Sequence, residues 1–503
     1  MDQMVPWSLV FEQARQDMFY ILPQMILVLF ALTILLTDFL LRARQKVWNA
    51  LTAMLGVALS GVSLWLMADI RYVGFDNSIV IDPFFIFFGF IVLATTALVI
   101  LLSVRYLEIE GEQQGEYYAL VMFAAVGMLF VACGNDLVVL FLGLETMAVS
   151  FYVLAGFLRR NRRSNEAALK YILFGAFSSA ILVYGFSILY GLAGSTNLDA
   201  IAEKLAERHA LFPGGDLLTY IALGTVAAGV FFKIAAVPFH QWAPDVYEGA
   251  PTTITAYISA ASKAASFALL LRLFLTVFWP SRIEWVTMVA VAGVLTLTVG
   301  TLAAITQTNL KRLLAYSSIA QVGYILLGLV AAVNSDGSLN RLGLEAVAYY
   351  LLVYAFFNTG AFAVVTLLRR KGAIGDEIDD LNGLLQRNPV AAVLMLIFLL
   401  SLAGIPPTAG FVAKFLIFWA LVETKHYILA VLAAACLVPA AYFCFRMVAA
   451  MWVRESGEES RGVITWAQKV ALGAMAGVTL LAGIFPEQFL RFASYSILNP
   501  FQR

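Results

Sequence analysis

Long apolar runs separated by short polar stretches fill almost the whole chain. A helix needs roughly 20 consecutive apolar residues to cross the hydrocarbon core of a membrane. Windows of that length predict an all-α polytopic membrane protein with about fourteen transmembrane helices. The expected spans are 18–40, 48–68, 83–104, 116–133, 136–157, 168–191, 217–238, 253–277, 285–305, 313–332, 344–368, 390–421, 428–452 and 465–485.

Proline interrupts two of these spans, the seventh and the twelfth. The seventh continues into KIAAVPFHQWAPDVYEGAPTT at positions 233–253, and the twelfth contains GIPPTAGF at 404–411. Each proline removes a backbone donor and clashes with the preceding turn, so both helices should break at these prolines. In lipid, such a break survives only where it is buried in protein or lines a wet cavity. The pattern therefore favours a transport path through the chain.

The two interrupted spans lie five spans apart, and an odd number of spans between equivalent elements inverts their orientation. Paired interrupted helices of this kind are typical of transporters built from inverted repeats. We therefore expect two inverted five-helix repeats, spans four to eight and nine to thirteen, each with one proline-broken helix. Two unrelated proline kinks are the alternative. The expected units are three N-terminal transmembrane helices (1–110), the first repeat (111–280), the second repeat (281–455), and a C-terminal transmembrane helix with a tail (456–503).

Composition agrees with a membrane protein that has small loops. The chain is 62% hydrophobic and 13% charged, with a mean hydropathy of +0.87, whereas a soluble domain is about 25% charged. The net charge of zero gives no support to a nucleic-acid partner. Cys133, Cys436 and Cys444 fall in apolar runs without a CxxC spacing, so they are expected to be core residues. No motif for a metal, an iron-sulfur cluster or a dinucleotide is present in the sequence, so we expect no metal or cofactor on this chain.

Basic residues alternate between the predicted connections. They gather in RARQK (42–46), RRNRR (159–163), Lys311 with Arg312, RRK (369–371), and Arg454 with Arg461. One set of connections holds about eighteen basic residues and the other about nine, which assigns the first set to the cytoplasm. Because the number of spans is even, both termini are expected to face the periplasm or its equivalent.

Four charged residues fall in or beside the interrupted and central spans. Glu145 lies midway along the fifth span, Lys233 precedes the break of the seventh, Lys263 is central in the eighth, and Lys414 follows the break of the twelfth. A charge at the bilayer centre costs at least a few kcal/mol, so it is normally paired, hydrated or functional. Arg272 and Arg446 lie closer to span ends, where extension of the side chain to the interface is expected.

A buried lysine loses proton affinity through desolvation and regains it beside a carboxylate. A Glu145–Lys233 pair followed by Lys263 and Lys414 could therefore conduct protons laterally, if water and hydroxyls join them. Each supporting side chain has an alternative role in helix packing. The supporting candidates are His240, Tyr316, Ser317, Ser318, Gln321 and Asn358.

VPFHQWAPDVYEGAPTT, NLKRLLAYSSIAQVGY, GIPPTAGFVAKF and the mid-span Glu145 together resemble the antiporter-like membrane subunits of respiratory complex I, NADH:quinone oxidoreductase, and among them the bacterial subunit N branch. The resemblance covers spans four to thirteen. It implies that Glu145 and Lys233 form the ion pair of the first repeat, that Lys263 is the central relay and that Lys414 is the outlet. Lys414 argues against subunit M, which usually carries glutamate there.

One position departs from the family pattern. Gln321 stands where many relatives have histidine, and an amide cannot take up a proton in the physiological range. His240, at the first break, is expected either to bond freed carbonyls or to act near the cytoplasmic entry. Asp245 and Glu248 are expected to be interfacial or turn-forming residues.

The resemblance further implies that NADH, FMN, iron-sulfur clusters and quinone are bound by partner subunits. The expected partners are other membrane-arm subunits, chains like subunits M, K, J and A, in the inner membrane of a bacterium. Two alternatives stay open: a subunit of a multisubunit cation/proton antiporter or membrane-bound hydrogenase, and a structural subunit that does not pump.

Overall fold

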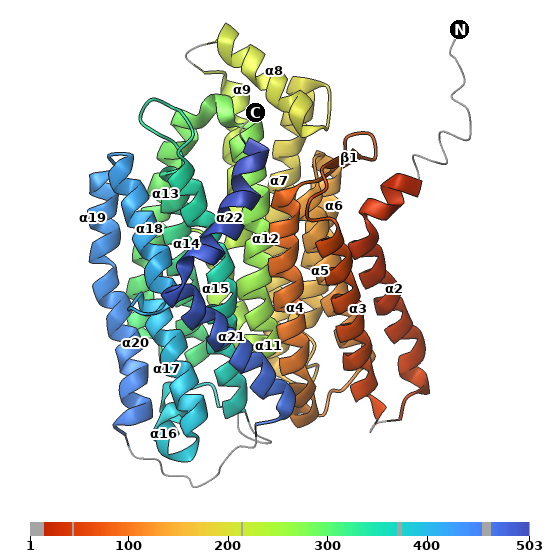
Figure 1. Ribbon diagram of the computed structural model, residues 1–503, viewed down its shortest axis with the longest axis vertical. Helices are drawn as coiled ribbons and strands as arrows, with labels where there is room; N and C mark the ends of the chain where they lie inside the picture. The colour runs from red at the N-terminus through yellow and green to blue at the C-terminus, as the bar shows by residue number, and fades with distance from the viewer. Residues whose placement is uncertain (1–14, 43–44, 213–214, 370–374, 455–463, 502–503) are drawn as a thin grey trace.

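The computed structural model describes residues 15–42, 45–212, 215–369, 375–454 and 464–501. Within these residues, 13 helices are long and apolar enough to cross a membrane. A further helix crosses as two pieces, α17 and α18. Together they form one bundle of roughly parallel helices (Figure 1), which confirms the predicted all-α membrane fold.

The helix bounds follow the predicted spans closely. The first part of the chain forms α2 (Leu22–Thr37), α3 (Val47–Leu66), α4 (Pro83–Glu110), α5 (Gly115–Cys133), α6 (Leu137–Ala155), α7 (Arg162–Ala193), α8 (Leu198–Leu211), α9 (Leu217–Ile234), α10 (Trp242–Gly249), α11 (Thr252–Tyr257) and α12 (Lys263–Arg272). The second part forms α13 (Arg282–Thr306), α14 (Leu310–Val330), α15 (Arg341–Leu368), α16 (Leu384–Arg387), α17 (Pro389–Ala403), α18 (Ala409–Glu423), α19 (Tyr427–Ala435), α20 (Leu437–Trp452), α21 (Trp466–Ile484) and α22 (Pro486–Phe501).

Short elements complete the fold. A hairpin of β1 (Tyr72–Gly74) and β2 (Ile79–Ile81) joins α3 to α4. Two π-helical segments, η3 (Ile258–Ser262) and η4 (Leu273–Val277), flank α12 and make one continuous span with α11. Single 3-10 turns follow α2 (Asp38–Leu40), precede α13 (Trp279–Ser281) and precede α16 (Ile378–Leu381).

Both predicted interruptions are present. α9 ends at Ile234 and α10 begins at Trp242, and α17 ends at Ala403 before α18 begins at Ala409. α9 enters from the end of the bundle that carries α8, whereas α17 enters from the end that carries α16 (Figure 1). The two interrupted helices therefore run in opposite directions, as inverted repeats require. The repeat itself and its proposed boundaries remain predictions, and the boundary at 455 lies outside the described residues.

Three spans occupy the interior of the bundle. The α11–α12 span is 100% buried over its most apolar window, α14 is 94% buried and α15 is 89% buried. Spans at the periphery are far less buried: the buried share of the same window is 28% for α19–α20 and 39% for α7. Most polar side chains within the windows of the three interior spans are therefore shielded from lipid and must find partners within the protein.

The last span is also interrupted, which the sequence analysis missed. α21 ends at Ile484 and α22 continues from Pro486 to Phe501, where a tail was expected. Pro486 cannot donate to the carbonyl of Ala482, and the Tyr349 hydroxyl of α15 donates to that oxygen instead, at 2.6 Å. A Cβ on Gly483 would lie 2.1 Å from the Pro407 oxygen, so this third interruption packs against the second.

The two ends of the described chain lie at the same end of the bundle (Figure 1). Successive spans cross alternately, so the connections that carry Arg42, Arg159, Arg163 and Lys311 lie at the opposite end. We call this opposite end the basic end. Arg44, Arg370, Lys371 and Arg461 lie outside the described residues.

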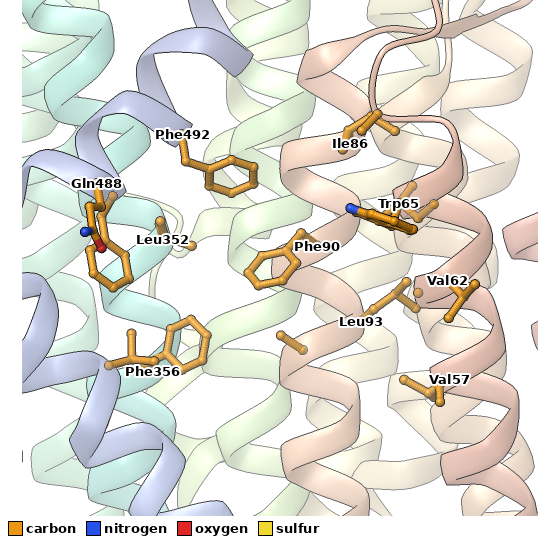
Figure 2. A pocket seen from close by; sticks show the side chains of 17 residues that line it. Val57, Val62, Trp65, Ile86, Phe90, Leu93, Leu352, Phe356, Gln488 and Phe492 are labelled. Atoms are coloured by element: carbon orange, nitrogen blue, oxygen red, sulfur yellow. The ribbon is translucent and has the colours of Figure 1, made fainter.

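An apolar cavity of about 790 Å³ lies between α3, α4, α15, α21 and α22. Figure 2 shows Trp65, Phe90, Phe356 and Phe492 around it. Gln488 is the one lining residue with a polar side chain apart from the Trp65 indole. Because no lining residue titrates, this cavity is separate from the charged residues that the sequence singled out.

Candidate functional site

The first charged group is a three-residue cluster on α6, α7 and α9. Lys233 Nζ lies 3.8 Å from Glu145 Oε1, and the Ser179 hydroxyl lies between them. Ser179 donates to Glu145 at 2.5 Å and accepts from Lys233 at 3.2 Å. The side chain of Lys233 is 6% exposed and that of Glu145 is 28% exposed. The structure thus brings the predicted pair together, with the carboxylate nearer to the surface of the chain.

The interruption beside Lys233 is held by specific bonds. Trp242 Nε1 donates to the Phe232 carbonyl at 2.9 Å, and the Val237 amide donates to Thr296 Oγ1 of α13 at 2.9 Å. These bonds satisfy backbone groups that the loss of helix leaves free. They also fix α10 against the end of α9, so Lys233 and α10 form one unit.

The second charged group surrounds Lys263 in the interior. Its ammonium donates to the Ser318 hydroxyl of α14 at 2.5 Å and to the Ser318 carbonyl at 3.2 Å. Ser318 Oγ lies 2.5 Å from the Tyr354 hydroxyl of α15. Tyr354 in turn donates to the Ser259 carbonyl at 2.9 Å, just before Lys263 on the same span. Lys263 therefore begins a hydrogen-bonded chain that returns to its own span at Ser259, with no carboxylate in it.

The third charged group lies at the second interruption. Lys414 donates to the Leu402 carbonyl at 2.7 Å, and Gln321 Nε2 of α14 donates to the same oxygen at 3.2 Å. The Tyr350 hydroxyl of α15 donates to Gln321 Oε1. The Lys414 ammonium also lies 4.9 Å from the centre of the Tyr324 ring. The carbonyl that the break frees at the end of α17 thus becomes the acceptor for two side chains.

Two parallel rungs between α14 and α15 lie between the second and third groups. Ser318 with Tyr354 forms one rung, and Gln321 with Tyr350 forms the other. Residues three and four apart are neighbours on a helix face, so the rungs lie one turn apart. Together they place a row of polar side chains in the interior between Lys263 and Lys414, which we call the polar seam.

Comparisons with known proteins agree with this geometry. Residues 134–438 match the family model described as NADH:quinone oxidoreductase/Mrp antiporter, TM. The chain is 49% identical to NADH-quinone oxidoreductase subunit N 2 of Solibacter usitatus, over 99% of this chain and 100% of that one. It is 51% identical to subunit N 1 of Koribacter versatilis, over 96% of each.

The chain belongs to the NADH-quinone oxidoreductase subunit N family. Among solved structures, it is similar to a chain of respiratory complex I from Thermus thermophilus, at 30% identity and a TM-score of 0.78, covering 94% of this chain and 99% of that one. The Mrp complex of Dietzia shares the fold at 21% identity, with a TM-score of 0.80 and coverage of 95% and 97%. The chain is therefore a multi-pass membrane subunit of a respiratory complex, and its partners are other complex I subunits.

The remaining residues that the sequence singled out in this subunit N family member take no part in the two rungs. Ser317 and Asn358 are fully buried beside the seam, and the Ser317 hydroxyl has no hydrogen-bond partner among the described residues. His240 is half-buried in the first interruption, and its Nδ1 also has no partner there. Tyr316 is partly exposed, and it stands two and five positions before Ser318 and Gln321 on α14, which puts it on a different face of that helix. The geometry therefore sets Tyr316 apart from the seam.

The acidic residues of α10 are ion-paired, which is a more defined role than the interfacial one expected for them. Arg312 of α14 bonds Asp245 at 2.7 Å and Glu248 at 2.9 Å, and Lys170 of α7 bonds Asp245 at 2.7 Å. Lys311 donates to the Ala250 carbonyl at 2.8 Å. We call Lys170, Asp245, Glu248 and Arg312 the α10 ionic cluster. It ties α10 to α7 and α14 at the basic end.

Arg272 and Arg446 reach polar groups at helix ends. Arg272 is 6% exposed; it donates to the Ala132 carbonyl at 2.9 Å and lies 3.6 Å from Asp82. Arg446 donates to the carbonyls of Ile305 and Gln307 at the end of α13. Free carbonyls at helix ends and a carboxylate lie within reach of these side chains, and their extension to a membrane interface stays a prediction.

Sequence reasoning missed the tyrosines of the seam. Tyr350 and Tyr354 are spaced four apart on α15, as Ser318 and Gln321 are spaced three apart on α14. That matched spacing on two neighbouring spans was the available signal. Within the described part of the chain, no group of three or more His, Cys, Asp or Glu side chains could hold a metal ion.

Proposed function

We propose that this chain translocates protons as a membrane-arm subunit of an NADH:quinone oxidoreductase. The observation that carries the proposal is the buried polar seam from Lys263 to Lys414, with the Glu145–Ser179–Lys233 cluster beside the first interruption. The relatives at 49% and 51% identity bear the name of that complex. Redox groups would be held by partner subunits, so quinone reduction there drives the proton movement here.

The geometry suggests an order of events. Glu145 and Lys233 are joined through one hydroxyl rather than by direct contact, so a small movement of α6 or α9 opens the pair. Lys233 then loses the carboxylate that favours its charged form and releases its proton more readily. Lys263 and Lys414 have no carboxylate partner among the described residues and exchange protons through hydroxyls and water. The seam then delivers the proton toward Lys414.

The proposed setting follows the same reasoning. The neighbours would be chains like subunits M, K, J and A in a bacterial inner membrane. The basic end would face the cytoplasm, because connections rich in lysine and arginine are retained there. Both termini would then face the periplasm.

The proposal is tested by replacing Glu145 with Gln and Lys233 with Met in the assembled complex. Proton pumping into inverted vesicles is measured alongside NADH:quinone electron transfer and subunit content. We expect pumping to fall in both variants while the complex stays assembled. Lys469→Met is the matched control, because Lys469 is exposed on α21. Wild-type pumping in both assembled variants would refute the proposal and favour a structural subunit, whereas sodium-coupled transport without quinone reduction would favour a cation/proton antiporter.

A further inference from the structure

The short helix α10 has two chemically different faces. Asp245 and Glu248 are three residues apart on one face and pair with Arg312. Tyr247 lies between them in sequence and therefore points to another face. Its side chain is 0% exposed and contacts the Trp242 and Phe362 rings, with centroids 6.1 Å away in each case. α10 therefore carries the α10 ionic cluster on one face and packs another face, with Tyr247, into the interior of the bundle.

No hydrogen bond of good geometry reaches the Tyr247 hydroxyl from the described residues. It is nevertheless close to the Lys263 rung: the Lys263 ammonium lies 5.9 Å from the Tyr247 ring centre, the Ser318 side chain is near enough for a weak hydrogen-bonding interaction with the hydroxyl, and the hydroxyl interacts electrostatically with Tyr354 and Tyr171. A buried hydroxyl without a partner costs about 1–3 kcal/mol, and proteins normally satisfy such a group with an internal water. We therefore expect an internal water molecule at the Tyr247 hydroxyl.

A second buried acceptor lies beside the same rung. Asn358 donates to Ser259 Oγ at 2.7 Å, but its Oδ1 has no partner among the described residues. Ser259 is the residue whose carbonyl accepts from Tyr354. A water needs two to four polar partners to be held in a protein interior. Tyr247 and Asn358, with the hydroxyls of Ser318 and Tyr354, supply that number around Lys263.

We infer that Tyr247 is a proton-relay residue, and that water bound by its hydroxyl connects Lys263 to the α10 side of the bundle at the basic end. The inference rests on the proposed function and adds the route by which protons reach Lys263 from the basic end. A hydronium ion on the α10 side gives a proton to the Tyr247 oxygen and becomes water, while the O–H proton of Tyr247 passes to water bound near Lys263. The hydronium formed there protonates the neutral Lys263 amine, so one proton moves and the hydroxyl and both waters are regenerated. The ionic cluster positions α10, and with it the hydroxyl.

The inference is tested with Tyr247→Phe, which removes only the hydroxyl. Tyr257→Phe is the matched control, because the Tyr257 side chain is equally buried but its hydroxyl is already bonded to Thr96 at 2.7 Å. Protons pumped per NADH oxidised are measured in the assembled complex. We expect Tyr247→Phe to lose most of the pumping and Tyr257→Phe to retain it. Wild-type pumping in assembled Tyr247→Phe would overturn the inference.

Two further readouts keep the result unambiguous. If Lys233→Met loses pumping while Tyr247→Phe keeps it, only the role of Tyr247 fails; if Lys233→Met and Glu145→Gln both keep it, the proposed function fails instead. A high-resolution cryo-EM map of the unmodified complex tests the water directly, whether or not the variants assemble. We expect density within hydrogen-bond distance of the Tyr247 hydroxyl, and a dry, ordered site there would also overturn the inference.

Discussion

Gln321 and Lys414 donate to the same backbone oxygen, that of Leu402, at 3.2 Å and 2.7 Å. The acceptor is free because α17 ends one residue later, so the interruption creates the site that both side chains use. The side-chain oxygen of Gln321 accepts a hydrogen bond from the Tyr350 hydroxyl. An amide at this position therefore does not end the polar seam, because it donates one hydrogen bond and accepts another. It also links Tyr350 to the carbonyl that Lys414 uses.

Replacing Gln321 with Leu should weaken proton pumping. The change breaks both bonds of the rung, and each is worth about 1 kcal/mol, so transfer through it should slow roughly fivefold or more. Gln321→His should retain more activity, because an imidazole can also donate on one side and accept on the other. Pumping per NADH oxidised distinguishes the two variants, and equal activity of Gln321→Leu and wild type would exclude a role for the rung.

Replacing Ser179 with Ala should impair the Glu145–Lys233 cluster. The hydroxyl bonds both charged groups, and a hydrogen bond to a charge is worth about 1.5–3 kcal/mol. We expect pumping to fall about tenfold. The neighbouring variant Ser178→Ala is the control, because Ser178 bonds only the Gly229 carbonyl at 3.3 Å. A matching loss in both variants would point to damage of α7 packing rather than to the cluster.

Replacing Tyr349 with Phe should destabilise the chain by about 1–3 kcal/mol, because the Ala482 carbonyl would stay buried without its donor. The loss should be partly recovered in the double variant with Pro486→Ala, since alanine restores an amide that can donate to Ala482. Thermal unfolding of the detergent-purified complex measures both effects. No recovery in the double variant would show that the interruption itself, rather than the carbonyl, stabilises this region.

The attachment of α8 should depend on pH. Arg208 of α8 bonds Asp216 at 2.7 Å, and this guanidinium holds the pKa of the Asp216 carboxyl below its usual range. A lowered pKa in the folded state means that the pair stabilises α8 above the ordinary pKa of aspartate and is lost as pH falls below it. The protection of α8 amides against hydrogen exchange, relative to the intrinsic exchange rate at each pH, should therefore fall on acidification. Asp216→Asn should show weak protection at every pH, and an unchanged pH response in that variant would contradict the assignment.

Much of the architecture was predictable because the bilayer makes local sequence decisive. Each apolar run must cross as a helix, and Pro238 and Pro406 must interrupt theirs, whatever the rest of the chain does. The pairing of Glu145 with Lys233, which the family resemblance implied and their opposite charges allowed, is present. The break at Pro486 was missed because it follows an apolar run already long enough to count as a complete span.

The sequence by itself determined which segments cross the membrane, where two of them break, and which spans carry Glu145, Lys233, Lys263 and Lys414. These features depend on transfer free energies and backbone chemistry that act over one span at a time. Only the tertiary structure decided that Ser179 bridges the ion pair, that Tyr350 and Tyr354 form rungs with Gln321 and Ser318, and that Tyr316 stays partly exposed. The physical reason is that a hydroxyl meets its partner only when helices distant in sequence reach the right rotation and depth.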